Sequence, residues 1–219
     1  HGPTFRSEAF PEYKAQREET PEDIRKAVPI IKDLLKAYRI PILQVDGFEA
    51  DDVIGTLATK AGADGIDTFM LTPDKDYGQL VSDHVKIYRP RHGGGYEVMG
   101  PKEVMAKYEI PSPMAVIDLL ALMGDSADNF PGCPGVGEKT AVKLINEFGS
   151  IDALIERSSE IKGKLREKVE EHVDDIRMSY FLATIKTDVP IALDMEALKL
   201  VDPNEDELSK LLLELEMKS

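Results

Sequence analysis

The feature that most constrains the fold is a change in the hydrophobic pattern near the middle of the 219-residue chain. Before residue 100, short apolar runs typical of buried strands alternate with segments whose apolar residues recur at helical spacing. After Pro101 almost every apolar segment has helical spacing. Strand, helix, strand in that order implies parallel strands joined by a right-handed crossover. The sequence therefore predicts an α/β half with a parallel sheet, then an all-helical half beginning between residues 100 and 110.

Turn and capping residues define the expected elements of the first half. Thr20 fits an N-cap, because Pro21 and acidic residues follow it in the first helical turn. Strands are expected where β-branched and aromatic residues lie between turn residues. The expected elements, in order, are a loop or exposed helix over 1–20, a helix over 20–40, a buried strand over 40–45, a helix from Glu49 or Ala50 to about Gly62, a strand over 66–72, and a hairpin of 85–90 and 95–99 joined across RHGGG.

The second half is expected to be helical throughout, without a solenoid repeat. Its expected helices are 101–108, 112–124, 137–149, 150–158, 161–185 and 204–218. The expected domains are 1–107, 108–203 and a connector helix over 204–219.

Composition excludes several classes of protein. With 42% hydrophobic and 31% charged residues, the chain resembles an ordinary globular protein. No apolar run approaches the roughly 20 residues of a membrane span, and no signal peptide is visible. Cys133 is the only cysteine, so no intramolecular disulfide is expected, and a cytoplasmic location is the default. The formal charge of −14 argues against a protein that simply coats nucleic acid.

Acidic residues gather where three predicted elements end or begin. Because ligands bind beyond the carboxyl ends of parallel strands, we expect these carboxylates to meet at one rim. Their mutual repulsion then calls for cations, and Mg²⁺ or Mn²⁺ prefers carboxylate and water oxygens. Two such ions about 4 Å apart would suit phosphodiester cleavage. The residues are Glu49, Asp51 and Asp52 after the first strand, Asp74 and Asp76 after the second, and Asp125 and Asp128 after the helix at 112–124.

Each acidic group also has a simpler interpretation. Two aspartates at a helix N-terminus can serve only as caps that complement the helix dipole. An Asp-x-Asp sequence after a strand can be an ordinary turn, or part of a phosphatase or sugar-nucleotide transferase site. Spacing alone does not name the reaction.

A glycine-rich stretch, FPGCPGVGEKT, precedes the helix expected at 137–149. Glycines at 132, 135 and 137 allow close approach of a phosphate, and amides at a helix start point toward an anion. Lys139 and Thr140 add side-chain donors. A P-loop is not indicated, since a helix rather than a strand precedes. The pattern favours a helix–hairpin–helix grip on the DNA backbone over a simple glycine-rich turn.

Basic and aromatic residues alternate near the N-terminus. Such a segment suits a single nucleic-acid strand, whose phosphates pair with cations and whose bases stack on rings. The alternative is a solvated amphipathic segment. The residues are Arg6, Lys14 and Arg17 with Phe5, Phe10 and Tyr13.

Several motifs together closely resemble the 5′-nuclease domains of bacterial DNA polymerases I, in the flap endonuclease superfamily. They are PTFR, YKAQR, GFEADDVIGTLA, LTPDKDYGQLV, LMGDSADNFPGCPGVGEKTAVKLI and FGSIDAL, in order from residue 3. The resemblance implies a PIN-like α/β nuclease core with an arch, then a helical subdomain with a helix–hairpin–helix-like DNA-binding element. It implies two divalent cations, K⁺ at the 132–137 hairpin, and a location at the bacterial nucleoid. Implied partners are 5′ flaps, nicked or gapped duplexes and RNA primer ends, in a protein that continues into proofreading-like and polymerase domains.

Matching motif to motif, the resemblance also implies individual roles. Catalytic roles fall to Lys14, Arg17, Asp51 and Asp76. Metal-binding roles fall to Glu49, Asp51, Asp52, Asp74, Asp76, Asp125 and Asp128. DNA contacts fall to Arg6, Lys14, Arg17, Gly135, Val136, Gly137, Lys139 and Thr140.

One departure from the family affects the expected activity. The family's sheet opens with a strand that carries an aspartate, and a second aspartate would lie just upstream of His1; this sequence contains neither. We therefore expect the fragment to keep a second metal site but to be impaired as a nuclease. A non-catalytic DNA-structure-binding module is the alternative function, and a small-molecule phosphohydrolase is a remote third.

Overall fold

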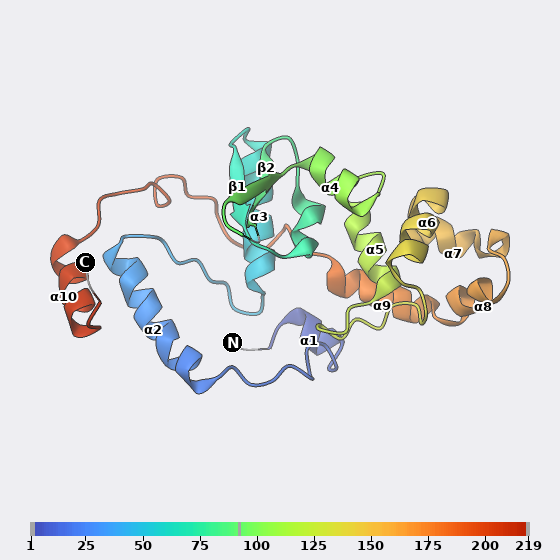
Figure 1. Ribbon diagram of the computed structural model, residues 1–219, viewed down its shortest axis with the longest axis horizontal. Coiled ribbons are helices and arrows are strands. Elements are labelled where there is room, and N and C mark those ends of the chain that lie inside the picture. Colours follow the sequence, from blue (N-terminus) through green and yellow to red (C-terminus); the bar gives the residue numbers. More distant parts are fainter. Residues whose placement is uncertain (1–2, 92, 218–219) are drawn as a thin grey trace. The chain divides into compact units, whose positions relative to one another are not determined.

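The computed structural model describes residues 3–91 and 93–217. Contacts within the chain divide it into two units. Unit 1 contains the residues up to Arg17 and Val45–Ile191, and unit 2 contains Glu18–Gln44 and the residues from Ala192 onward. Figure 1 shows the course of the chain and labels its helices and strands. Every site residue that the sequence predicts lies in unit 1.

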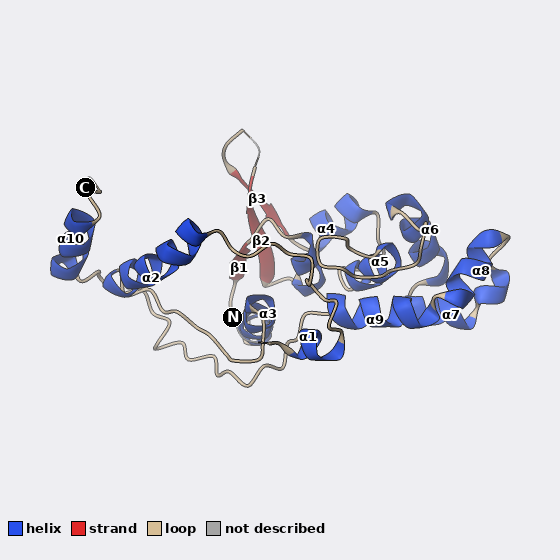
Figure 2. Cartoon of the chain, turned by 90° about the horizontal axis from the view of Figure 1, so that it is seen from below, coloured by secondary structure: helices blue, strands red, loops and turns tan. Residues whose placement is uncertain are grey.

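Unit 1 contains a three-stranded sheet in the order β1 (Thr68–Leu71), β2 (Val85–Pro90), β3 (Tyr96–Met99). β1 and β2 are parallel, and β2 and β3 form an antiparallel hairpin. Val85, Ile87 and Met99 are buried and begin the hydrophobic core. The predicted strand over 66–72 and the predicted hairpin are confirmed; residue 92 of its turn lies outside the described residues. Figure 2 shows the strands grouped in this sheet.

The strand predicted over 40–45 is wrong. These residues form no strand, and Ile40, Ile42 and Leu43 are each at least 40% exposed. The segment belongs mostly to unit 2, whose described secondary structure is helical. An apolar run becomes a strand only where a partner strand accepts its backbone hydrogen bonds. The parallel pair is therefore β1 with β2 rather than the predicted pairing with 40–45.

Two short elements of unit 1 present the first acidic groups. α3 (Ala50–Ala63) begins where the sequence predicts, with Glu49 as its N-cap, and the Asp52 carboxylate accepts a hydrogen bond from the Glu49 backbone amide. η1, a 3₁₀ helix over Lys75–Leu80, follows β1 with Asp74 as its N-cap. Asp74 accepts a hydrogen bond from the Asp76 amide, which is the cap geometry expected of a short polar residue.

The remainder of unit 1 is helical. α5 (Ala115–Met123) is its central element, buried from Ala115 to Leu122 and packed on α6 and α9. The predicted all-helical second half is confirmed, except that 161–185 forms two helices separated at His172, whose backbone leaves helical geometry. The other elements are α4 (Pro101–Tyr108), α6 (Glu138–Phe148), α7 (Ile151–Glu156), η2 (Ser158–Glu160), α8 (Lys164–Glu171) and α9 (Val173–Ala183).

The N-terminal segment of unit 1 matches the predicted loop or exposed helix only in part, since many of its described residues are exposed but two are buried. It forms α1 (Phe5–Ala9) and then turns, and the side chains of Arg6 and Tyr13 are only 2% and 7% exposed. The burial of these two residues ties the segment to α3, as described below.

Unit 2 contains α2 (Glu22–Ala37) and α10 (Glu205–Glu214), which contact each other. Pro21 rather than Thr20 is the N-cap of α2, a correction of one residue. Asn204 caps α10 with its side chain, and its backbone amide donates to the Ala37 carbonyl at 2.8 Å. The end of the predicted helix, residue 218, lies outside the described residues. In the part of the chain that the structure describes, no helix has the length and apolar character to cross a membrane.

Candidate nuclease site

Asp52 is the innermost of the three acids at the start of α3. Its side chain is fully buried, and Arg6 binds it with two nitrogens at 2.7 and 2.8 Å. The Lys186 amide donates a third hydrogen bond at 2.9 Å. Burial acts to raise the pKa of Asp52, but these hydrogen bonds outweigh it and hold the pKa below its usual range. In this structure Asp52 therefore forms a buried ion pair with Arg6, and its metal-binding role stays a prediction.

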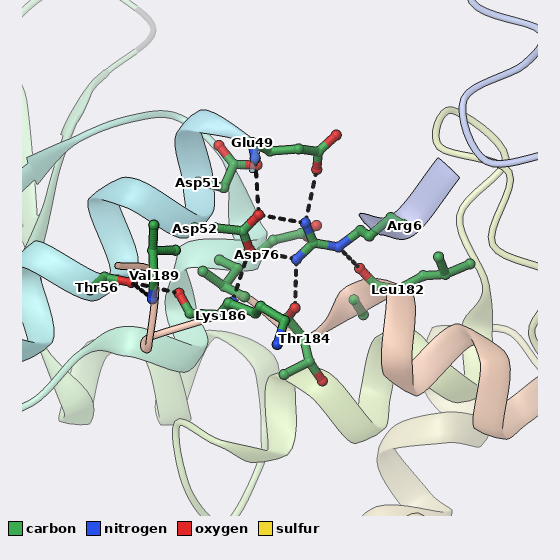
Figure 3. Close-up of polar contacts among 12 residues, drawn as sticks. Arg6, Glu49, Asp51, Asp52, Thr56, Asp76, Leu182, Thr184, Lys186 and Val189 are labelled. Carbon is green, nitrogen blue, oxygen red and sulfur yellow. Dashed lines mark hydrogen bonds and ion pairs between the residues drawn. The ribbon is translucent and has the colours of Figure 1, made fainter. Parts of the chain in front are cut away.

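Arg6 completes this buried network, and Figure 3 shows its partners. Beyond Asp52 it donates to the carbonyls of Leu182 and Thr184 at 2.9 and 2.6 Å, and to Glu49 at 3.2 Å. A guanidinium whose donors all have protein partners has none left for a phosphate. The DNA contact of Arg6 stays a prediction. In this structure the side chain joins α1 and α3 to the C-terminal end of α9 and the residue after it.

Glu49 also binds two later residues of the N-terminal segment. The Tyr13 hydroxyl donates to Glu49 at 2.9 Å, and Lys14 Nζ lies 2.9 Å from the other carboxylate oxygen. The same ammonium lies 3.7 Å from Asp128. Lys14 therefore connects the first acidic segment to the third.

Two side chains of η1 make the remaining connections. The Tyr77 hydroxyl donates to Asp51 at 2.7 Å, which joins η1 to α3. Lys75 Nζ lies 2.8 Å from Asp125, which joins η1 to the loop after α5. With the Lys14 contacts, these bonds close a ring through all three acidic segments. We call the acids of the three joined segments, apart from Asp52, the acidic cluster; its members are Glu49, Asp51, Asp74, Asp76, Asp125 and Asp128.

The loop after α5 is folded so that Asp125 and Asp128 lie in one tight turn. Asp125 and Phe130 exchange two backbone hydrogen bonds, at 2.8 and 3.2 Å. Gly124 and Gly132 touch beneath them, both with positive φ; a Cβ at Gly132 would lie 2.4 Å from the Gly124 nitrogen. Only glycine fits this crossing. Asp128 at the tip forms an ion pair with Arg17.

Asp76 is the most strongly perturbed member of the acidic cluster. Burial, with the charges of Asp74, Asp125 and Asp128, raises its pKa to about 7, although Lys75 opposes the shift. Its Oδ1 is buried with no hydrogen-bond partner, the one such side-chain atom among the residues described. Burial likewise raises the pKa of Asp51, against the hydrogen bond from Tyr77. A buried carboxylate oxygen without a donor is the arrangement that a cation would complete.

The donor set of the acidic cluster fits a hard divalent cation, since it contains only carboxylates. In the described part of the chain, however, no three histidine, cysteine, aspartate or glutamate side chains stand close enough together to hold a metal ion directly. Lys14 lies between Glu49 and Asp128. Arg17 and Lys75 each form an ion pair with one acid of the cluster. Side-chain movement or bridging water is needed before the carboxylates share an ion.

The glycine-rich hairpin lies at the start of α6, as the sequence predicts. Gly135 has a φ of +78°, and Gly137 is the N-cap of α6. Val136 is buried, and its amide donates to the Cys133 carbonyl at 3.0 Å. Lys139 is exposed and Thr140 is half-buried. Lys168 of α8 covers Gly135 closely enough that a Cβ there would lie 2.4 Å from its Nζ.

Sequence reasoning missed Lys75 and Tyr77, although both lie within the motif that contains Asp74 and Asp76. Their bonds to Asp125 and Asp51 join residues that are 50 and 26 positions apart, and no local pattern reports such pairs. Tyr13 was expected to stack on a nucleic-acid base. Instead it stacks on Phe130, with 5.9 Å between ring centroids, and binds Glu49.

Two family models match the sequence. The model of the 5′-3′ exonuclease N-terminal resolvase-like domain matches residues 1–109, and that of the 5′-3′ exonuclease C-terminal SAM fold matches residues 111–206. The first model contains the predicted sites at residues 6–76, and the second contains Asp125, Asp128 and the glycine hairpin.

Curated relatives with similar sequences are bacterial enzymes. DNA polymerase I of Bacillus subtilis (strain 168) is 44% identical over 198 residues, which cover 90% of this chain and 22% of that protein. The thermostable DNA polymerase I of Thermus filiformis is 41% identical over 218 residues, covering 99% of this chain and 26% of the relative. The chain thus spans about a quarter or less of the proteins it matches.

Solved structures with a similar fold are nucleases. T5 5′-exonuclease with bound divalent zinc ions aligns with a TM-score of 0.71 at 22% identity, covering 97% of this chain and 80% of that one. The catalytic core of Rad2 in complex with DNA substrate aligns with a TM-score of 0.64 at 18% identity, covering 97% and 71%. The predicted fold class, an α/β nuclease core followed by a helical subdomain, is confirmed.

Proposed function

The chain belongs to the 5′-3′ exonuclease family, and we propose on that basis that it is a metal-dependent nuclease that cuts DNA near a 5′ end. The observation that carries the proposal is the ring of direct contacts that brings three acidic segments, far apart in sequence, into one cluster. Asp76, with its raised pKa and its unpartnered buried oxygen, lies in that cluster.

We propose that the acidic cluster holds two divalent cations, Mg²⁺ or Mn²⁺. Such ions would activate a water nucleophile and neutralise charge on the leaving oxygen. T5 5′-exonuclease, which shares the fold, has been crystallised with zinc ions. The chain's own part is to gather the carboxylates: Tyr77 holds Asp51, and Lys75 holds Asp125.

Lys14 and Arg17 suit a role in binding the scissile phosphate. Both cations lie beside Asp128 at the edge of the acidic cluster, and Arg17 is 55% exposed. When a cation takes over the carboxylates, these side chains become available to a phosphate. They would then orient the strand and stabilise the charge that develops during cleavage.

The glycine hairpin suits the duplex next to the cut. The Val136 amide already donates to the Cys133 carbonyl at 3.0 Å. The amides of Gly135 and Gly137, with the side chains of Lys139 and Thr140, offer donors to backbone phosphates without reading bases. We propose K⁺ at residues 132–137 as a bridge to the phosphate. Salt should weaken this grip.

The proposed substrates are 5′ flaps, nicked or gapped duplexes and RNA primer ends. Rad2, a second protein of this fold, has been crystallised with a DNA substrate. Because the relatives are DNA polymerases I, we propose proofreading-like and polymerase domains in the parent protein and a cytoplasmic location at the nucleoid. We also propose domain limits of 1–107, 108–203 and 204–219.

The test compares the chain with Asp76→Asn on a labelled 5′-flap DNA in Mg²⁺. Asp76→Asn should cleave at least about 100-fold more slowly, beyond what loss of an outer partner of a metal ligand costs, and should still bind the flap. Asp152→Asn is the matched control, since Asp152 is 71% exposed on α7 and should leave cleavage unchanged. Equal rates for Asp76→Asn and the unsubstituted chain would refute the proposal.

One observation favours a second function, a DNA-structure-binding module without catalysis. Lysine and arginine side chains already neutralise several acids of the cluster, and no three described acids are gathered as a metal group. That function predicts tight flap binding by the unsubstituted chain, no cleavage in Mg²⁺ or Mn²⁺, and unchanged binding after Asp76→Asn.

A further inference from the structure

We infer that Tyr77 is a positioning residue that fixes Asp51 relative to Asp76, and that it thereby sets the affinity of the acidic cluster for a divalent cation. This inference rests on the proposed function, because it concerns the same cluster. It assigns a task to a side chain that carries no charge and would not itself touch the cation.

The contact itself is short and shielded. Tyr77 is 3% exposed, and its hydroxyl donates to Asp51 Oδ1 at 2.7 Å. Asp51 lies in the first turn of α3, whereas Tyr77 follows Asp76 directly in η1. Among the described residues, this is the one side-chain hydrogen bond between η1 and the acids at the start of α3.

Tyr77 can position Asp51 because η1, the element that carries Tyr77, is itself held in place by several hydrogen bonds. Gln79 is 5% exposed and donates to the carbonyls of Asp76 and Ala183, each at 3.0 Å. Its side-chain oxygen accepts from the Ile185 amide at 2.8 Å. Gly78, between the two, has no spare room, since a Cβ there would lie 3.1 Å from Val116. The Tyr77 ring is therefore fixed relative to the Asp76 backbone.

α3 is anchored to the same region from its other side. The Asp52 carboxylate accepts from the Lys186 amide, and Thr56 accepts from the Val189 amide at 3.1 Å. Residues 183–189 thus hold both η1 and α3. These backbone anchors fix the two elements but leave the Asp51 side chain free to rotate; the Tyr77 hydroxyl is the group that stops that rotation.

The expected consequence follows from the behaviour of metal ligands in general. Carboxylates that bind a cation are oriented by outer hydrogen bonds, and losing one such partner typically costs about 10–100-fold in affinity or activity. Tyr77 donates to one oxygen of Asp51, which selects how its other oxygen is presented. Without the hydroxyl, Asp51 must lose rotational freedom when the cation binds.

The experiment compares Tyr77→Phe with a matched control, Tyr180→Phe, in the full chain. Tyr180 is a half-buried tyrosine of α9 whose hydroxyl donates to no described residue. Mn²⁺ binding is measured without DNA by electron paramagnetic resonance, and kcat and KM are measured separately on flap DNA. Thermal unfolding in chelator checks that both variants are folded at the assay temperature.

We expect Tyr77→Phe to weaken Mn²⁺ binding by about 10–100-fold and to lower kcat at fixed Mn²⁺, with KM for DNA unchanged. Excess Mn²⁺ should restore most of kcat. Tyr180→Phe should match the unsubstituted chain in every measurement. A purely structural role predicts a lower melting temperature with Mn²⁺ affinity unchanged, and that result would overturn the inference alone. An unsubstituted chain that binds no Mn²⁺ would overturn the proposed function and the inference with it.

Discussion

Asp52 and Asp76 are both largely buried aspartates in unit 1, yet their surroundings differ in almost every respect. Asp52 has bonds from Arg6, Lys186 and the Glu49 backbone, and its pKa is lowered. Asp76 has an oxygen with no donor and like charges around it, and its pKa is raised to about 7. Burial is common to both, so the donors around a carboxylate, and not its depth, separate a structural acid from a candidate ligand.

The two regions should respond to pH in opposite directions. Because the folded-state pKa of Asp52 is lowered, its contribution to stability is present above its unfolded pKa and is lost as pH falls. Because the folded-state pKa of Asp76 is raised from 3.8 to about 7, its favourable contribution is complete below pH 3.8 and is lost as pH rises through about 7. Only the second region should gain stability from a cation at neutral pH.

The largest effect should come from removing the buried ion pair between Arg6 and Asp52. Arg6→Met leaves a buried carboxylate without its partner and should lower the free energy of unfolding by about 3–5 kcal/mol at pH 7. Urea unfolding followed by circular dichroism measures the change. Arg157→Met is the control, because the pair of Arg157 with Glu160 is exposed and its loss should leave stability nearly unchanged. A loss as small as that of the control would show that Asp52 does not depend on Arg6.

The next largest effect should be the stabilisation of the Asp76 region by a bound cation. Adding Mg²⁺ at pH 8 to about 100 times its dissociation constant should stabilise the chain by about 2.7 kcal/mol, since the cation binds only the folded acidic cluster. Differential scanning calorimetry gives the shift. Asp76→Asn should show little of this gain, whereas Asp152→Asn should keep it. Equal gains in all three proteins would place the bound cation elsewhere.

A smaller effect concerns Asp76 in chelator. Asp76→Asn removes an ionised, poorly partnered carboxylate and should raise the free energy of unfolding by about 1–3 kcal/mol at pH 8. At pH 4 native Asp76 is itself protonated, so the gain should vanish. Unfolding measured at both pH values tests this. A gain that persists unchanged at pH 4 would mean that charge is not its source.

The same comparison shows what the sequence can predict. Adjacent acids on α3 face different neighbours, so the pattern EADD groups Glu49, Asp51 and Asp52 although only the first two join the acidic cluster. What distinguishes Asp52 is Arg6, 46 positions away, and Lys186, 134 positions away. Convergence of the three acidic segments was predicted from where helices and strands end, but one of those strands, over 40–45, does not form. The first segment is instead joined to the others by the contacts of Lys14 and Tyr77. Which acid would be paired was not, because that depends on side chains brought in by tertiary packing.

The prediction of a strand over 40–45 is wrong for a related reason. Its apolar residues fit a buried strand, but strand formation needs a partner, and the neighbouring segments of unit 2 are helical. The local sequence pattern predicts helices well because the backbone hydrogen bonds of a helix lie within the helix itself. It predicts strands, ion pairs and outer partners of ligands poorly, because each depends on residues far away in the sequence.

The smallest effect should come from removing the uncharged hydrogen bonds of Thr56, which lies one turn after Asp52 on α3. Thr56 is fully buried; its hydroxyl accepts from the Val189 amide at 3.1 Å and donates to the Lys186 carbonyl at 3.3 Å. Thr56→Val keeps the shape but leaves both backbone groups unpaired, which should cost about 1 kcal/mol at any pH. Thr56→Ser keeps the hydroxyl and should lose less. Urea unfolding at pH 5 and pH 8 separates this loss from the charge effects, because no titrating group is removed. If Thr56→Val costs as much as Arg6→Met, the hydrogen bonds to residues 183–189, rather than the buried ion pair, would be the main support of the region.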